Sequence, residues 1–161
     1  MATTIVPSNL IVTITESYSL NGVDYGNTMN KTYTDNGQVS QRVMSIAGST
    51  VGEDTNFFTN ILSLSTIDGQ GQVVKVDYKY FRITNLDTAN TLYLRVYNGA
   101  NWITLEASPA STILFMDAGT DVPATATTVI SLKDIEEIAG QSSSATEAID
   151  VEFVMVTGVT A

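Results

Sequence analysis

Apolar and polar residues alternate along much of the chain, a pattern that is typical of half-buried β-strands. In residues 10–14 and 92–97 every second position is apolar. Successive side chains of a strand point to opposite faces, so each of these stretches has one face suited to a core. Shorter apolar runs predict further strands, and a long closing strand is expected at the end; these lie at residues 56–67, 102–105, 112–116 and 149–158.

The alternation in residues 74–84 changes phase in the middle of the stretch. The even-numbered residues from Val74 to Tyr80 are mostly apolar, but beyond Tyr80 the apolar positions shift to Phe81 and Ile83. A shift by one residue is what a β-bulge produces. We therefore expect one long strand with a bulge next to Tyr80.

Two turns punctuate the first third of the chain. Asn21-Gly22 is a strong signal for a two-residue hairpin turn. Asp35-Asn36-Gly37 predicts a second hairpin, in which the return strand has Val39 on one face and Arg42 on the other. Gln41 and Val43 share the face of Val39, whereas Met44 and Ile46 share the face of Arg42.

One helix is predicted, near residues 131–139. Ser131 followed by Asp134 resembles a capping box, with Asp in place of the usual Glu or Gln. Ile135 and Ile138 have the spacing of one helix face, and Gly140 suits a helix end.

Composition supports a protein made almost entirely of strands. The 161 residues include 23 Thr and 16 Val but only 4 Lys, and β-branched residues favour the pleated sheet. Short strands at this spacing, joined by hairpin turns, predict an all-β, antiparallel fold that is a sandwich or a barrel. Residues 1–8 are expected to form an N-terminal arm, and residues 9–161 a single domain.

Charge and missing residue types exclude several classes of function. Seven basic residues against seventeen acidic ones give a net charge of −10, which is unsuited to binding nucleic acid or an anionic membrane. The chain has no Cys and no His, so thiol and imidazole chemistry is absent. The first ten residues do not have the pattern of a signal peptide, and no apolar stretch is long enough for a membrane helix. No cofactor is expected.

Acidic side chains are the remaining candidates for chemistry. Glu53-Asp54, Glu136-Glu137 and the pair Asp117 and Asp121 are the carboxylate pairs. A glycosidase needs two carboxyl groups that face one cleft, but adjacent acids on a strand or helix point apart, so solvated surface charge is the favoured interpretation. Residues 117–121 offer oxygen ligands for a cation, although their spacing matches no EF-hand and a loop is favoured. No catalytic residue is assigned, and the chain is expected not to be an enzyme.

Four of the seven basic residues gather in one region of the sequence. One interpretation is a basic stripe that docks an acidic partner, including another copy of this chain; the alternative is a solvated strand face. The candidate interface residues, with two apolar residues of the N-terminal arm, are Ile5, Val6, Lys75, Lys79, Arg82 and Arg95.

Glu16 raises a separate question because it follows Val12 and Ile14 on what is otherwise an apolar face. An unpaired buried carboxylate is costly, so either the face is solvated at Glu16 or a basic residue meets it. Arg42 is the predicted partner in a structural ion pair.

Three aromatic residues lie close together in sequence around the turn at residues 97–101, namely Tyr93, Tyr97 and Trp102. Exposed aromatic side chains stack on sugars or anchor interfaces, whereas buried ones pack in a core or at a sheet edge. Both interpretations remain open.

Several segments resemble parts of small virion proteins of tailed bacteriophages, particularly marine ones. The segments are LIVTITESYSLNGVDYGNT, VSQRVMSI, FRITNLDTANTLYLRV, LEASPASTILF, SLKDIEEI and IDVEFVMVTG. The resemblance implies a β-sandwich or jelly-roll that decorates the head, joins head and tail, or forms part of the tail. It implies no catalytic residue.

The expected function is therefore that of a non-enzymatic virion structural protein. Such a protein is made in the host cytoplasm, forms a homo-oligomer, and contacts copies of itself and the major capsid or tail proteins. The alternative is a glycan- or receptor-binding β-sandwich module of a tail, which would use the three aromatic residues.

Overall fold

The computed structural model describes residues 8–48, 58–64, 78–100, 102–116 and 135–158. These residues form eleven β-strands and no helix. The first four strands are β1 (Ser8–Glu16), β2 (Ser19–Leu20), β3 (Val23–Asp24) and β4 (Asn27–Ile46). The others are β5 (Thr59–Ser63), β6 (Tyr78–Asn85), β7 (Leu92–Tyr97), β8 (Trp102–Ala107), β9 (Thr112–Met116), β10 (Glu137–Ser142) and β11 (Ile149–Gly158).

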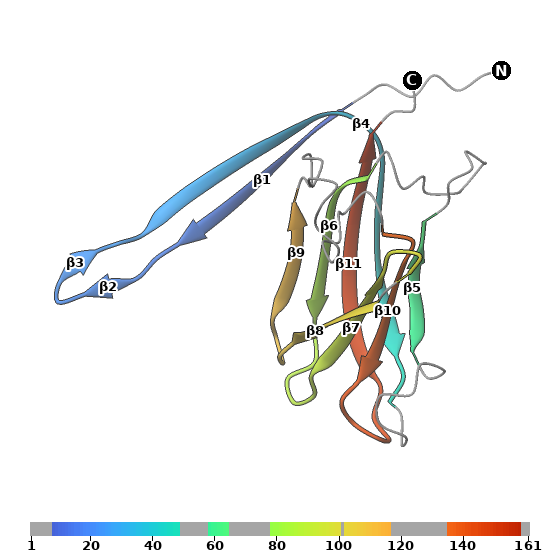
Figure 1. Ribbon diagram of the computed structural model, residues 1–161. Helices are drawn as coiled ribbons and strands as arrows, with labels where there is room; N and C mark the ends of the chain where they lie inside the picture. The colour runs from blue at the N-terminus through green and yellow to red at the C-terminus, as the bar shows by residue number, and fades with distance from the viewer. Residues whose placement is uncertain (1–7, 49–57, 65–77, 101, 117–134, 159–161) are drawn as a thin grey trace.

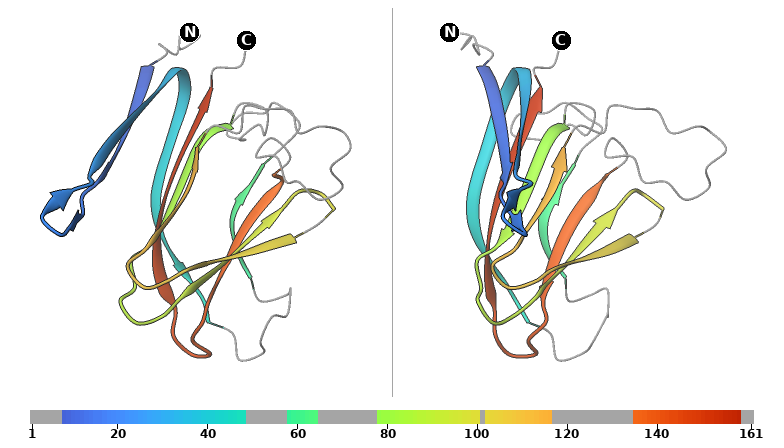
Figure 2. Two further views of the ribbon diagram at one scale, coloured as in Figure 1. Left: turned by 60° about the vertical axis from the view of Figure 1, so that its left-hand side comes forward. Right: turned by 90° about the vertical axis from the view of Figure 1, so that its left-hand side faces the viewer.

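Two larger antiparallel sheets face each other (Figures 1 and 2). The five-stranded sheet has the order β1-β4-β11-β6-β9, and the four-stranded sheet has the order β5-β10-β7-β8. Their facing sides share one hydrophobic core, to which β6 and β11 contribute Phe81 and Phe153, and β7 and β10 contribute Leu94 and Ile138. The prediction of an all-β, antiparallel fold is thus confirmed.

Strands β7 and β11 show the predicted alternation clearly. Leu92, Leu94 and Val96 are buried, whereas the residues between them are partly exposed. On β11 the inward residues run from Ile149 to Met155 at every second position. These patterns arise because one face of each strand meets the core and the other does not.

The predicted helix near residues 131–139 is wrong. Glu137–Ser142 form strand β10, which pairs with β5 on one side and β7 on the other, while residues 131–134 lie outside the described part. Gly140 faces the core, and a Cβ atom there would lie 2.9 Å from Ile61 Cδ1. Pairing with β5 and β7, and the close contact of Gly140 with Ile61, favour a strand over the helix that the spacing of Ile135 and Ile138 predicts. Local sequence does not show these distant contacts.

The hairpin predicted at Asp35-Asn36-Gly37 is also wrong, because the two arms of β4 on either side of this segment pair with other strands and not with each other, although the chain bends sharply between them (Figure 2). Asp35 has φ of +55° and Asn36 pairs with both Ser8 and Gly158, so the segment is an irregularity within a continuous strand. Before it, β4 pairs with β1; after it, β4 pairs with β11. A residue with positive φ suits a bulge as well as a turn, and here the partner strands select the bulge.

The first predicted turn and the predicted bulge are close to what is observed. Asn21 and Gly22 have φ of 53° and 78°, as a two-residue hairpin turn requires, and join β2 to β3. The irregularity in β6 falls at Lys79, one residue before Tyr80, since Tyr78 and Tyr80 pair with the consecutive residues Thr157 and Val156.

The described chain from β1 to the first part of β4 forms a long hairpin that extends away from the two sheets (Figure 1). We call residues 8–35 the projecting hairpin. Its base is fixed by Asn36, whose Nδ2 donates to the carbonyl oxygens of Ser8 and Tyr33 at 2.8 and 2.9 Å. Figure 2 shows the projecting hairpin on the outer side of the five-stranded sheet.

Candidate functional site

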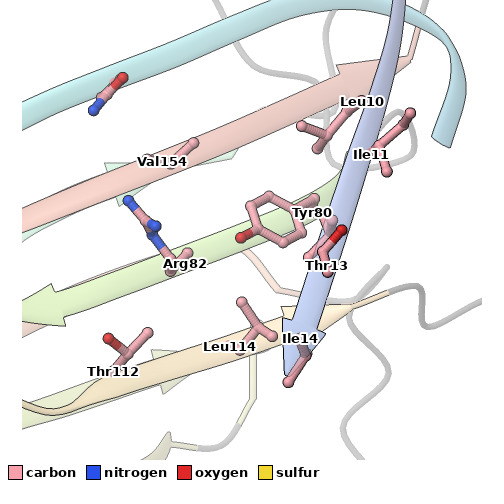
Figure 3. Close-up of a pocket in the computed structure, with 11 residues that line it drawn as sticks. Leu10, Ile11, Thr13, Ile14, Tyr80, Arg82, Thr112, Leu114 and Val154 are labelled. Carbon is pink, nitrogen blue, oxygen red and sulfur yellow. The ribbon is translucent and has the colours of Figure 1, made fainter. Parts of the chain in front are cut away.

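A groove of about 530 Å³ separates the projecting hairpin from the outer face of the five-stranded sheet. Figure 3 shows β1 crossing over this face, with Leu10 and Ile14 on the hairpin side and Tyr80, Leu114 and Val154 on the sheet side. The groove exists because β4 changes partners at Asp35 to Gly37, so the hairpin departs from the plane of the sheet.

The base of the groove is closed by a small apolar cluster, separate from the main core. Tyr33, Tyr80 and Val156 are buried there, and Leu10, Val12, Leu114 and Val154 pack around them. The rings of Tyr33 and Tyr80 lie 6.1 Å apart in a tilted arrangement. Burial raises the pKa of the Tyr80 phenol, and the positive charge of Arg82 opposes that change. The cluster shows that the hairpin and the sheet face are complementary apolar surfaces.

Beyond this cluster the projecting hairpin loses its contact with the rest of the molecule. Tyr33 is 5% exposed, Met29 is 48% exposed, and Leu20 at the tip is 57% exposed. Tyr18 and Tyr25 stack on each other with ring centroids 5.3 Å apart, yet both are exposed. These tip residues escaped the sequence analysis, although Tyr18 and Leu20 continue the even-numbered apolar positions of residues 10–14.

The far end of the groove carries charged and polar groups. Arg82 Nη2 lies 2.5 Å from Glu152 Oε2, and Gln41 Nε2 donates to Glu152 Oε1 at 2.7 Å. The Arg82 side chain is still about one-third exposed. A guanidinium has five N–H donors, so Arg82 has donors left for a second carboxylate.

The predicted basic stripe is not assembled among the residues described. Arg82 lies on the outer face of the five-stranded sheet, whereas Arg95 lies on β7 of the other sheet, over the rings of Phe58 and Trp102. Lys79 donates through Nζ to the carbonyl oxygens of Thr34 and Asp35 and so braces the irregularity in β4. Ile5, Val6 and Lys75 lie outside the described residues.

The predicted ion pair between Glu16 and Arg42 is not formed. Glu16 is exposed and pairs through its backbone with Asn27 on the projecting hairpin. Arg42 lies on the inner side of the sheet, where Nη2 donates to the Ile61 carbonyl oxygen at 2.6 Å and the guanidinium lies 4.5 Å from the centre of the Phe153 ring. The prediction failed because the two arms of β4 do not pair with each other, so Glu16 lies on the projecting hairpin and Arg42 lies in the main sheet beside β11.

The three aromatic candidates lie on the four-stranded sheet. Tyr97 and Trp102 stack across the β7–β8 pair, with ring centroids 4.5 Å apart. Trp102 is 42% exposed, and Tyr97 Oη donates to the Gly99 carbonyl oxygen at 2.7 Å. Tyr93 is on the same side of β7 but is partly buried and pairs with Glu106. The stacked pair is a small, partly exposed aromatic platform.

Of the three carboxylate pairs named from the sequence, the structure describes one. Among the residues that the structure describes, no group of three or more Asp or Glu side chains is placed to hold a metal ion. Glu136 and Glu137 lie at the start of β10. The other pairs, Glu53-Asp54 and Asp117 with Asp121, and with them the cation loop at 117–121, lie outside the described residues.

Neither a membrane-spanning helix in the described residues nor a known relative adds a candidate. None of the described residues belongs to a helix with the length and hydrophobicity to cross a membrane. Comparison with family models, curated proteins and solved structures finds no match to this chain. The projecting hairpin and its groove are therefore the candidate functional site, identified from geometry alone.

Proposed function

We propose that this chain is a non-enzymatic structural protein of a tailed-phage virion, a capsid decoration (cement) protein or a head–tail or tail assembly component. It acts by associating with copies of itself and docking on major capsid or tail proteins. In this proposal the two facing sheets are a β-sandwich of jelly-roll-like type. The observation that carries the proposal is the projecting hairpin, whose tip presents exposed apolar residues away from the body.

A hairpin of this kind has a physical reason to bind a neighbour. Two strands without a third strand or a covering layer are at best marginally stable in water. The distal part of β1 pairs only with β4. Burial of the exposed apolar side chains there on a partner would lower the free energy. An element that gains stability by packing on a neighbouring subunit is well suited to a structural protein.

Mass spectrometry of purified particles tests the virion assignment. Particles from a culture that produces the chain are purified on a density gradient, and their proteins are quantified against the major capsid protein. We expect the chain in a fixed ratio to that protein. If it stays in the soluble fraction of the lysate while intact particles lack it, the virion assignment is overturned.

A second candidate function, glycan or receptor binding on a tail, is favoured by the stacked pair Tyr97 and Trp102. A partly exposed aromatic face is suited to stack on a sugar ring. On a glycan array, Trp102→Ala should abolish any binding, whereas Tyr25→Ala, an exposed aromatic residue at the hairpin tip, should not. Binding that Trp102→Ala leaves unchanged, or no binding by the wild type, removes this candidate.

A further inference from the structure

We propose that the projecting hairpin of one copy docks with its distal apolar face on the outer face of the five-stranded sheet of a second copy. This inference rests on the self-association in the proposed function and names the two surfaces that carry it. The donor surface is the distal hairpin, with Ile14, Tyr18, Leu20, Val23, Tyr25 and Met29. The acceptor surface is the outer sheet face around Val39, Val43, Leu114 and Val154.

The donor surface is the continuation of a face that is already used within the chain. Leu10 lies opposite Tyr33, and Ile14 lies opposite Met29, so these four residues share one face of the hairpin. At the base this face packs on the sheet, and toward the tip it is bare. The opposite face of the hairpin is mostly polar there, since Thr13 Oγ1 donates to Asn30 Oδ1 at 2.8 Å.

The acceptor surface likewise extends past the contact that the chain makes with itself. Val154 and Leu114 lie at the edge of the base cluster and line the open groove. On the same face, Val39 lies opposite Val156, and Val43 lies opposite Glu152. Val43 is 60% exposed, and Val39 is exposed to a similar extent. The sheet face therefore presents more apolar surface than its own hairpin covers.

A second copy is the partner that this arrangement fits. The base cluster shows that the hairpin face and the sheet face pack on each other, and each surface extends beyond that contact. The same hairpin cannot fill its own acceptor surface, because Asn36 and Lys79 fix its base while it extends outward (Figure 1). A neighbouring hairpin of identical chemistry can.

Charge is compatible with this partner. Copies with a net charge of −10 repel each other, so contact is least opposed where the local charge is small. On the acceptor, Glu152 is neutralised by Arg82. On the donor, Glu16 continues the apolar positions and can reach a free N–H of the partly exposed Arg82 guanidinium. This contact answers the question that Glu16 raises in the sequence, with Arg82 of another copy in place of Arg42.

The donor and acceptor surfaces are different, and each copy carries one of each. The contact closes either into a two-fold pair, in which the two copies exchange hairpins and the interface is isologous, or into a heterologous ring, depending on the rotation between copies. Shielding both surfaces requires closure, since an open chain of copies leaves one donor and one acceptor uncovered at its ends.

Sedimentation equilibrium of the full chain tests the contact with matched variants. Leu20→Ser removes the donor tip, Val43→Ser weakens the acceptor, and Leu86→Ser is the control, because Leu86 is 46% exposed but lies outside both surfaces. We expect Leu20→Ser and Val43→Ser each to raise the dissociation constant about tenfold or more, because each removes an aliphatic side chain that the contact buries. Leu86→Ser should leave it unchanged, and circular dichroism and urea unfolding check that all variants fold.

A mixing experiment separates this contact from others. Leu20→Ser retains an intact acceptor and Val43→Ser an intact donor, so an equimolar mixture should regain a dimer that neither variant forms alone. Tip-to-tip association predicts that Val43→Ser behaves as the wild type, which would overturn the inference. Oligomers of wild-type strength in both variants would overturn it too, while leaving self-association intact. A wild type that stays monomeric at every concentration would instead overturn the self-association on which the inference rests.

Discussion

Asn85 is a fully buried polar side chain that ties together three segments of chain. Its Nδ2 donates to the carbonyl oxygens of Asn90, Ala107 and Ser108 at 2.8 to 3.3 Å, and its Oδ1 accepts from the backbone N–H of Asp87 at 3.1 Å. A buried polar group that loses its partner costs free energy, so these carbonyl groups depend on Asn85.

Replacing Asn85 by Ala should lower the free energy of unfolding by about 2 to 3 kcal/mol, because buried carbonyl groups lose their donors. Urea unfolding measures the change. Asn60→Ala is the matched control, since Asn60 is exposed and its side chain donates to the nearby Ser63 hydroxyl; its effect should stay within about 0.5 kcal/mol. Equal losses in the two variants would contradict the prediction.

Asp87 provides a pH-dependent contribution at the same corner. The backbone N–H groups of Asn90 and Ala89 donate to Asp87 Oδ1 and hold the pKa of this carboxyl below its usual value. The ionised form is thus favoured by folding. Its contribution to stability is complete above the unfolded pKa and is lost as the pH falls through the lower, folded pKa.

Asp87→Asn should therefore destabilise the protein more at neutral pH than in acid. The difference in unfolding free energy between wild type and Asp87→Asn should shrink as the pH is lowered from about 7 to below about 4, the usual range of an aspartate pKa. Asp150→Asn, which removes an exposed carboxylate on β11, serves as the control. A difference in unfolding free energy that stays constant with pH would show that folding does not favour the ionised form of Asp87.

At the scale of elements, β4 decides the shape of the molecule because one strand belongs to both the hairpin and the main sheet. The change of partner at Asp35 to Gly37 directs the hairpin away from the sheet. Asn36 is buried at this point and bonds both Ser8 and Tyr33. Asn36 therefore contributes to the orientation of the whole hairpin, together with Lys79, which donates to the carbonyl oxygens of Thr34 and Asp35.

Asn36→Ala should loosen the projecting hairpin while the body stays intact. We expect faster hydrogen exchange of the β1 amides, with the β7 amides unchanged, because the bonds that are lost join only β1 and β4. Asn30→Ala is the comparison, since it removes a bond between β1 and β4 that is exposed, from Thr13 Oγ1 to Asn30 Oδ1, and should speed exchange less. Faster exchange in β7 would mean that Asn36 supports the core rather than the hairpin.

The elements that the sequence predicts correctly are those whose pattern is set by one buried face. Residues 92–97 and 149–158 alternate because each strand has a core side, and that information is local. The predictions that failed concern segments whose structure is determined by strands distant in the sequence. Whether Asp35 sits in a turn or a bulge depends on β11, and the strand at Glu137–Ser142 depends on β5 and β7. The groove depends in turn on that bulge. The sequence therefore predicts which strand positions in the groove are apolar, but not that they lie around a groove.

At the scale of the whole molecule, the net charge of −10 opposes any contact between copies. Salt screens this repulsion, whereas it leaves apolar contacts in place or strengthens them. The balance between the two sets how association responds to ionic strength.

Raising the salt concentration from about 0.05 M to about 0.5 M should strengthen self-association several-fold, since the screening length falls well below the size of the molecule. Sedimentation equilibrium at each concentration measures the change, with Leu20→Ser run in parallel to separate specific from general salting out. Weaker association at high salt would show that ion pairs, not the apolar surfaces, dominate the contact.

The position of β11 also sets an order of folding. This strand lies in the middle of the five-stranded sheet, between β4 and β6. Ile46 of β4 pairs with Ile149 of β11, which lies about 100 residues further along the chain. The projecting hairpin needs only neighbours close in sequence, so it can form early, whereas pairings between distant segments form slowly. Because Val154 belongs to β11, we expect the donor strands to pair before the acceptor surface is complete, so that a half-folded chain presents no complete acceptor to a neighbour.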